Sequence, residues 1–155
     1  MWSKVRKKLI EMLPNCLKGK IDFQMTAYRF GWRSMDKGHQ CPTITIIYDK
    51  EIVLRTYQNV DYLKEHYKDK YDEKLHYDTY HFFNAFIEYI GMKHEVARTI
   101  NNYYIRLFTL LDKRTGKRTL ENIKEGYYEC KVKELRRIYE IRFNEEHIFL
   151  KNIKN

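Results

Sequence analysis

Apolar residues at the start of the chain recur at helical spacing. They lie three or four positions apart: Trp2, Val5, Leu9, Met12 and Leu13. This is the period of an amphipathic helix with one buried stripe. Ser3 fits the N-cap position, and Pro14 cannot continue the helix, so the pattern predicts an end just before Pro14. Lys4, Lys7 and Lys8 fall away from the apolar stripe.

After Gly19 the apolar period changes to two. Ile21, Phe23, Met25 and Ala27 alternate with polar residues, which indicates a half-buried strand. The stretch TITIIYDKEIVLRTY holds two more apolar runs. Asp49-Lys50 separates them at the spacing of a two-residue hairpin, although the favoured glycine is missing. With GWRSMDKGHQCP as the loop between the first two strands, the pattern predicts a three-stranded antiparallel meander.

From Val60 onward the pattern is helical. A first stripe at four-residue steps lies in a charged segment and comprises Leu63, Tyr67, Tyr71 and Leu75. A second segment is apolar around most of its circumference, through Phe82, Phe83, Phe86, Ile87 and Ile90. It predicts a buried helix that ends at Gly91. The third stripe comprises Val96, Ile100, Tyr103 or Tyr104, Leu107 and Leu110. It predicts one helix of about 18 residues that Gly116 terminates.

Two further helices complete the predicted fold. KRTLENIKEG predicts a short helix stopped at Gly126, and the last stripe comprises Val132, Leu135, Ile138, Tyr139 and Phe143. Residues 145–155 read as a short strand or a loose tail. A sheet followed by helices is the α+β pattern. We therefore expect a single α+β domain over residues 1–155, with an N-terminal helix, the meander and a bundle of four to five helices. The first helix and the 82–90 helix are the expected covers of one sheet face.

The composition limits the classes of protein to which the chain can belong. Of 155 residues, 43% are hydrophobic and 15% aromatic, which supplies enough ring area to close a core in a short chain. Cys16, Cys41 and Cys130 are an odd number, and the N-terminal segment lacks the apolar run of a secretory leader. No run approaches the roughly 20 apolar residues of a membrane span. We expect a cytoplasmic protein with reduced thiols.

The chain carries a formal net charge of +9, and the excess is uneven. Residues 1–20 hold six basic side chains against Glu11 alone, a net charge of +5, and residues 111–125 hold five against three, a net charge of +2. A surface of this kind attracts polyanions. The alternative is that a lysine-rich and isoleucine-rich composition reflects biased genomic coding.

Several segments resemble one family in order along the chain. They are MWSKVRKKL, CLKGKIDF, TAYR, DKGHQCPTITIIYDKEI, LLDKRTGKRTL and IYEIRFNEEHI. Their Trp-Ser-Lys N-terminus, Asp-Lys hairpin and Asp-Lys-Arg-x-Gly-Lys-Arg segment resemble a family of small bacterial proteins first recorded as an enterobacterial hypothetical open reading frame. The resemblance implies a bacterial intracellular protein and implies no activity.

The segment LLDKRTGKRTL, residues 110–120, has two interpretations. Lys113, Arg114, Lys117 and Arg118 flank Gly116 and can grip phosphates. Alternatively, cations in the last turn of a helix favour its negative end and a glycine caps it, with Asp112 paired to Arg114 or Arg118. The segment lacks the strand-loop-helix setting and the Lys-Ser/Thr ending of a nucleotide-binding P-loop.

The predicted sheet offers a second candidate surface. Tyr28, Phe30 and Trp32 lie beside Arg29 and Arg33, and aromatic side chains interleaved with arginine can stack bases. The alternative is that a helix covers this face and makes it core.

The histidines and cysteines do not form a recognisable catalytic pattern. His76 and His81 are five apart, and Asp78 with His81 can share a helix face, but a metal site would need more ligands. We predict no catalytic residue, no cofactor and no metal. The sequence favours a non-enzymatic binding module for nucleic acid or an acidic protein. An immunity or regulatory protein with one specific partner and an unrecognised enzyme remain the alternatives.

Overall fold

The computed structural model describes residues 2–29, 40–56 and 79–151. For residues 27–29, 40–42 and 80 it describes the backbone alone. The predicted stripe from Leu63 to Leu75, the residues Trp32 and Arg33, and the pair His76 and Asp78 lie outside these ranges.

The first helix, α1, spans Trp2–Met12 and ends before Pro14, as its period predicts. Leu9 on α1 and Leu13 just after it are fully buried, so the apolar stripe faces the core. The helix begins at Trp2, two residues before the start at Lys4 that a Ser3 N-cap would give. Ser3 therefore lies inside the first turn rather than at the N-cap.

The sheet is the predicted antiparallel meander, with strand order β1-β2-β3. Its strands are β1 (Ile21–Arg29), β2 (Gln40–Tyr48) and β3 (Glu51–Arg55). The hairpin turns at Asp49 and Lys50, whose φ angles are +43° and +70°. Positive φ at both turn positions matches the right-handed twist of the flanking strands, which is why a two-residue loop suffices here without a glycine.

The helix α3 spans Thr79–Ile90 and is less enclosed than its sequence predicts. Phe82, Phe86 and Tyr89 are buried, but Ile87 is 63% exposed and Ile90 is 46% exposed. The prediction of a buried helix holds for one face of α3 and is wrong for Ile87 and Ile90. The buried face packs against α5 (Tyr103–Leu111), where the Phe82 and Phe108 rings meet edge-on, and α3 also contacts β2.

The predicted 18-residue helix is divided in two. The short helix α4 spans His94–Ala97, and five residues separate its end from the start of α5. Asn102 causes the restart, because its side-chain oxygen accepts hydrogen bonds from the backbone N–H groups of Tyr104 and Ile105. The helix α5 ends at Leu111, and Gly116 is the N-cap of the next helix rather than the end of this one.

Three helices complete the described chain: α6 (Lys117–Asn122), α7 (Lys124–Glu129) and α8 (Lys133–Glu145). Gly126 lies within α7 instead of stopping a helix. The predicted stripe of α8 is confirmed, because Leu135, Ile138, Tyr139 and Phe143 are buried. After α8 the Ile148 side chain is also buried, whereas Phe149 is exposed.

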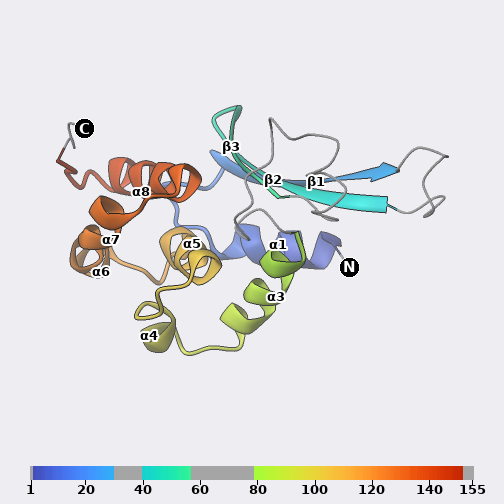
Figure 1. Cartoon of the computed structure of the whole chain (residues 1–155). Coiled ribbons are helices and arrows are strands. Elements are labelled where there is room, and N and C mark those ends of the chain that lie inside the picture. Colours follow the sequence, from blue (N-terminus) through green and yellow to red (C-terminus); the bar gives the residue numbers. More distant parts are fainter. Residues whose placement is uncertain (1, 30–39, 57–78, 152–155) are drawn as a thin grey trace.

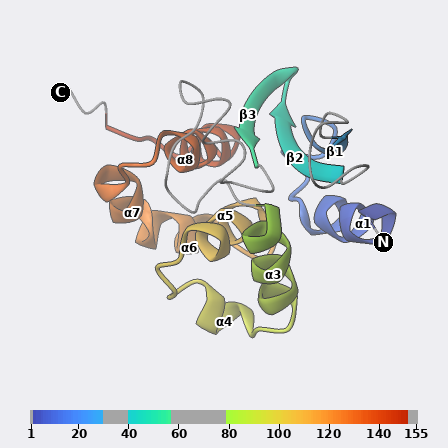
Figure 2. The ribbon, with the colours of Figure 1, turned by 45° about the vertical axis from the view of Figure 1, so that its right-hand side comes forward.

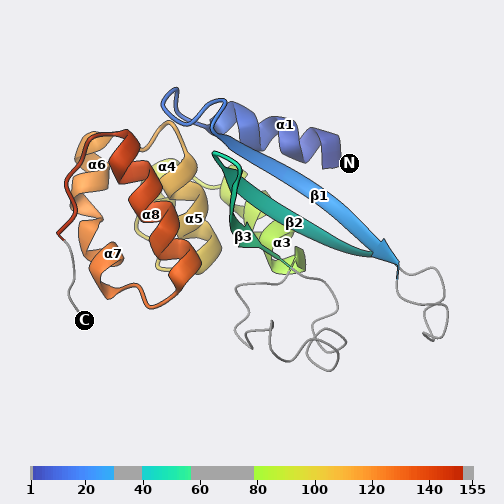
Figure 3. The same cartoon turned by 90° about the horizontal axis from the view of Figure 1, so that it is seen from above.

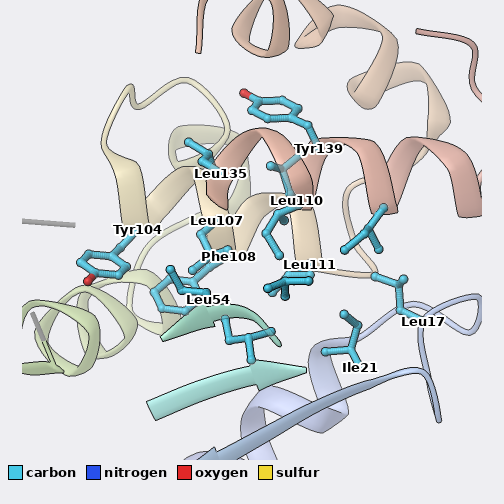
Figure 4. Packing of buried hydrophobic residues seen from close by; sticks show 14 of the residues in the cluster. Leu17, Ile21, Leu54, Tyr104, Leu107, Phe108, Leu110, Leu111, Leu135 and Tyr139 are labelled. Carbon is cyan, nitrogen blue, oxygen red and sulfur yellow. The ribbon is translucent and has the colours of Figure 1, made fainter. Parts of the chain in front are cut away.

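The helices lie mainly on one side of the sheet, which gives the predicted α+β architecture. Figure 1 shows α1, α3 and α5 beneath the sheet, with α8 beside β3. Figure 2 shows α7 at the edge of the molecule away from the sheet, and Figure 3 shows α6 and α7 on the side of α8 that faces away from the sheet. From above, α1 runs alongside β1 (Figure 3). Leu54 and Ile21 of the sheet meet Phe108 and Leu111 of α5 in the core (Figure 4).

Among the described residues, no helix combines the length and the apolar character needed to cross a membrane.

Candidate polyanion-binding surface

Residues 110–120, called the elbow below, connect α5 to α6. The elbow is attached to the other cation-rich part of the sequence, because the backbone N–H of Lys113 donates a 2.7 Å hydrogen bond to the carbonyl of Met12. Met12 is the last residue of α1. Two basic segments that lie about a hundred residues apart in the chain therefore meet in the fold.

Asp112 is the buried anchor of the elbow, with 1% of its surface exposed. Its carboxylate accepts hydrogen bonds from the backbone N–H of Arg114 at 2.8 Å and from the Arg114 Nη2 at 2.7 Å. The Tyr89 hydroxyl donates a third at 2.5 Å. Burial by itself raises the pKa of Asp112, but the bonds from Arg114 and Tyr89 outweigh it and hold that pKa below its ordinary value of 3.8.

The Arg114 side chain therefore makes its contacts within the fold, to Asp112 and Tyr89. Its guanidinium lies 5.9 Å from the centre of the Tyr89 ring and forms an ion pair with Asp112. Hydrogen bonds to Asp112 raise the pKa of Arg114. The sequence allows Asp112 to pair with Arg114 or with Arg118. In the structure it pairs with Arg114, and the two charges neutralise each other.

A second arginine, Arg142 of α8, holds the elbow from inside. Its side chain is 1% exposed, and its Nη1 donates to the carbonyls of Leu110 at 2.8 Å and Asp112 at 3.0 Å. Its Nη2 donates to the carbonyl of Thr115 at 2.5 Å. One guanidinium thus donates to three backbone carbonyls, of which those of Leu110 and Asp112 lie at the C-terminal end of α5. Burial lowers the pKa of Arg142, although nearby carboxylates act against it.

The charge of Arg142 is balanced by Glu146, one turn later on the chain. The Arg142 Nε donates to Glu146 at 3.2 Å, and the Cys16 thiol donates to the same carboxylate oxygen at 3.4 Å. Burial, followed by this hydrogen bond, raises the pKa of the Cys16 thiol. Cys16 is a free cysteine whose thiol form is favoured, so this site does not provide an activated nucleophile.

Sequence reasoning missed Arg142, and a signal for it existed. Arg142 follows Ile138 by four residues and therefore falls on the apolar stripe of α8. An arginine at such a position needs hydrogen-bond acceptors in the core. The backbone carbonyls of residues 110–116, where one predicted helix ends and the next begins, are candidates for these acceptors.

Other cations of the elbow remain exposed. Lys113, Lys117 and Arg118 are exposed, and among the described residues none of the three forms an ion pair. The one carboxylate within the elbow is Asp112, which is buried and occupied by Arg114. The charges of these three side chains are therefore not paired with a described carboxylate, and their electrostatic field extends into solvent.

The flank of α1 that leads to Met12 adds to them. Lys4, Lys8 and Met12 lie four residues apart and share one side of the helix. Both lysines are exposed and without an ion pair in the part of the chain that the structure describes. Arg6 faces a different way, since it bonds Asp22 at 2.6 Å and the carbonyl of Phe23. We define the cationic surface as Lys4, Lys8, Lys113, Lys117 and Arg118.

The backbone of Arg29, a candidate on the sheet, lies far from the elbow. Arg29 is the last residue of β1, and Ile21 is the first. Nine residues of strand place their backbones about 26 Å apart, and Ile21 is the end that lies near Leu111 (Figure 4). The side chain of Arg29, and the residues Trp32 and Arg33, lie outside what the structure describes.

The remaining chemistry of the described residues is sparse. His81 is exposed on α3. No three histidine, cysteine or carboxylate side chains within residues 2–29, 40–56 and 79–151 come together as a metal site. His94 bonds the Thr115 hydroxyl at 2.9 Å, which links α4 to the elbow, and burial lowers its pKa.

The comparisons with known proteins identify a family. The chain matches the model described as the SF0329 protein family over residues 1–70 and 56–143, two overlapping segments that reach from the first residue into α8. No curated protein matches the chain, and no solved structure does. The family description states no activity. The two matched segments cover most of the sequence, and the chain therefore belongs to the SF0329 protein family.

Proposed function

We propose that this protein is a non-enzymatic binding module that holds nucleic acid on the cationic surface. The observation that supports this most directly is the hydrogen bond between Lys113 and Met12, because it attaches the elbow to the C-terminal end of α1. A polyanion longer than a few phosphates can then contact both segments at once.

The arrangement inside the elbow supports the same function. Asp112 is buried and paired with Arg114, so it does not screen Lys113 or Lys117. Arg142 fixes the backbone of the elbow through three carbonyl contacts. A rigid backbone loses little entropy when its lysines bind, and such preorganisation favours affinity.

The chemistry of the surface predicts weak sequence preference. Four of its five members are lysines, whose ammonium groups are compact point charges. Contacts of this kind position a phosphate backbone and carry no sequence information. Affinity is then expected to depend on salt and strand length more than on base sequence.

Fluorescence anisotropy with mixed-sequence oligonucleotides across a range of salt concentrations tests the proposal. We expect the association constant to fall steeply as salt rises. The triple variant Lys113→Gln, Lys117→Gln, Arg118→Gln should bind more weakly and lower the slope of log K against log salt by about 2 to 3, since each lost phosphate contact removes roughly 0.7 to 0.9. The absence of binding at low salt would remove the proposal.

A matched control separates this surface from general positive charge. Arg98, Lys131 and Lys133 are exposed and, within the described residues, form no ion pair. Their triple glutamine variant has the same net charge as the elbow variant. We expect it to bind nearly as well as the unmodified protein. Equal losses in both variants would mean that net charge, and not this surface, governs binding.

The other two partner classes predict different results. An acidic protein partner would be indicated by binding to a polyglutamate peptide together with no binding to oligonucleotides. An immunity or regulatory protein would bind one partner through shape-matched contacts whose affinity changes little with salt.

A further inference from the structure

The face of the sheet opposite the core carries an unusual set of polar residues. Ile44, Ile46 and Leu54 are buried on the core side. Because side chains alternate along a strand, Thr43, Thr45 and Arg55 lie on the opposite face. Thr45 and Arg55 are direct partners across β2 and β3. Thr43 is two residues further along the same row, within reach of a long side chain.

Two of these three side chains carry a polar atom that is withdrawn from solvent and not satisfied within the described structure. Thr43 is 1% exposed and Thr45 is 7% exposed. The hydroxyl oxygen of Thr43 and the Nε of Arg55 are buried atoms without a hydrogen-bond partner in the described structure. No ion pair to Arg55 exists among the described residues either.

A buried donor without an acceptor is costly, and more so on a charged group. Natural proteins seldom leave such groups unpaired, so a partner is expected. The described carboxylate nearest in register, Asp22, lies on β1 opposite Ile47 and is bound to Arg6. The protein thus presents a guanidinium donor and a hydroxyl side by side with no described carboxylate available to meet them.

We propose that this face of the sheet binds a small oxyanion, a phosphate or carboxylate group, between Thr43, Thr45 and Arg55. The planar fork of arginine matches the oxygen spacing of both groups, and a threonine hydroxyl can donate to a third oxygen. The burial of Thr43 restricts the ligand to a free oxyanion or the terminal group of a small molecule. This site shares no residue with the cationic surface, so the two proposals stand or fall separately.

The test uses the full chain and two probes, potassium phosphate and sodium acetate. Each is titrated at constant ionic strength against chloride, and the thermal midpoint of unfolding is measured. We expect the midpoint to rise and saturate with one or both probes, because a ligand that binds the folded state stabilises it. The probe that saturates at the lower concentration identifies the oxyanion class.

Variants assign the effect to the site. Arg55→Gln should abolish the saturable rise, and Arg55→Lys, which keeps the charge but loses the fork, should weaken affinity at least tenfold. Arg98→Gln, an exposed cation that belongs to neither site, should respond like the unmodified protein. A shift that chloride reproduces, or one that persists in Arg55→Gln, would overturn the proposal.

A third variant keeps the test decisive if Arg55→Gln does not fold. Arg55→Met retains the length of the side chain and removes the buried, unpartnered Nε donor, so in chloride alone its thermal midpoint should equal or exceed that of the unmodified protein. It should also show no response to phosphate or acetate. A midpoint well below that of the unmodified protein would mean that Arg55 already has a partner within the fold, and the oxyanion site would be rejected.

Discussion

The Tyr89 hydroxyl donates a 2.5 Å hydrogen bond to the Asp112 carboxylate, from a helix that lies 23 residues earlier in the chain. Both side chains are buried. The bond joins the last turn of α3 to the elbow, and Arg114 contacts both partners from the solvent side. A charged group that is removed from water needs such bonds, since its hydration is lost.

Tyr89→Phe tests the weight of this contact. The substitution removes the hydroxyl and leaves Asp112 with one fewer donor, and hydrogen bonds to charged groups contribute about 1.5 to 3 kcal/mol. We expect a loss of that size in the free energy of unfolding, measured with urea at pH 7. Tyr128→Phe is the control, because its hydroxyl accepts only an exposed bond from the Lys151 backbone and its loss should cost under about 0.5 kcal/mol.

Asp112 also predicts how stability depends on pH. Its pKa in the folded protein lies below the ordinary 3.8, so the unfolded chain binds this proton more readily. The resulting stability is fully present above pH 3.8 and is lost as pH falls through the lower pKa of the folded state. Urea unfolding between pH 7 and pH 2.5 should show this loss.

The loss belongs to Asp112 only if it disappears with the carboxylate. Asp22, Glu51 and Glu145 also have lowered pKa values and titrate in a similar range. Asp112→Asn should therefore be less stable at pH 7 and should lose less stability on acidification than the unmodified protein. Parallel pH profiles for the two proteins would contradict the assignment.

Arg142 carries the largest predicted effect. Arg142→Met would leave the buried carbonyls of Leu110 and Thr115 without this donor and would remove the charge that balances Glu146. Breaking a buried charge pair by removing one partner costs about 3 to 5 kcal/mol. We expect the urea midpoint at pH 7 to fall accordingly, and Arg142→Lys to recover little, since one ammonium cannot replace the planar fork.

Arg137→Met is the matched control on the same helix. Arg137 pairs with Glu51 at 3.0 Å, but both side chains are substantially exposed. Exposed pairs contribute about 0 to 1 kcal/mol. Similar losses for the Arg142 and Arg137 variants would show that the buried contacts do not stabilise the elbow.

The sequence predicts the order of the elements well, because their periods are local. The change from three- and four-residue steps in α1 to two-residue steps from Ile21 is visible without a structure, and so is the Asp49-Lys50 turn. The interruption at Asn102 was missed. The apolar stripe continues across it, and only the capping bonds to Tyr104 and Ile105 reveal it.

The site was less predictable than the fold, since it depends on contacts between distant residues. The four elbow cations look alike in sequence, yet Arg114 is neutralised by Asp112 whereas Lys113 and Lys117 stay exposed. The contact between Lys113 and Met12 brings together two basic segments that lie far apart in the sequence, and the composition does not reveal this proximity. Neither fact has a periodic signature, because both arise from packing.

Gly126 occupies α7 for a steric reason. A Cβ at this position would lie 2.3 Å from the Tyr139 hydroxyl oxygen and 3.2 Å from the ring carbon that bears it. Gly126→Ala should therefore destabilise the protein by about 1 to 3 kcal/mol, despite the better helix propensity of alanine. Urea unfolding measures the loss.

A second substitution tests the cause. Tyr139→Phe removes the oxygen that the new methyl group would meet, so Gly126→Ala should cost less in that background. The double-mutant cycle should give a favourable coupling of about 1 kcal/mol or more. Additive losses would show that the contact between the helices α7 and α8 does not explain the glycine.

The hairpin between β2 and β3 offers a stabilising substitution. Lys50 has φ of +70°, a left-handed conformation that costs roughly 1 kcal/mol for a residue with a Cβ and little for glycine. Lys50 is exposed, so its side chain makes little packing contribution. Lys50→Gly should raise the free energy of unfolding by about 0.5 to 1 kcal/mol, whereas Lys50→Ala, which keeps the Cβ, should not.

Because neither the cationic surface nor the Arg55 site includes Lys50, oligonucleotide and oxyanion binding should be unchanged in both variants. Destabilisation by Lys50→Gly would mean that the gain in flexibility of the unfolded chain outweighs the relief of strain.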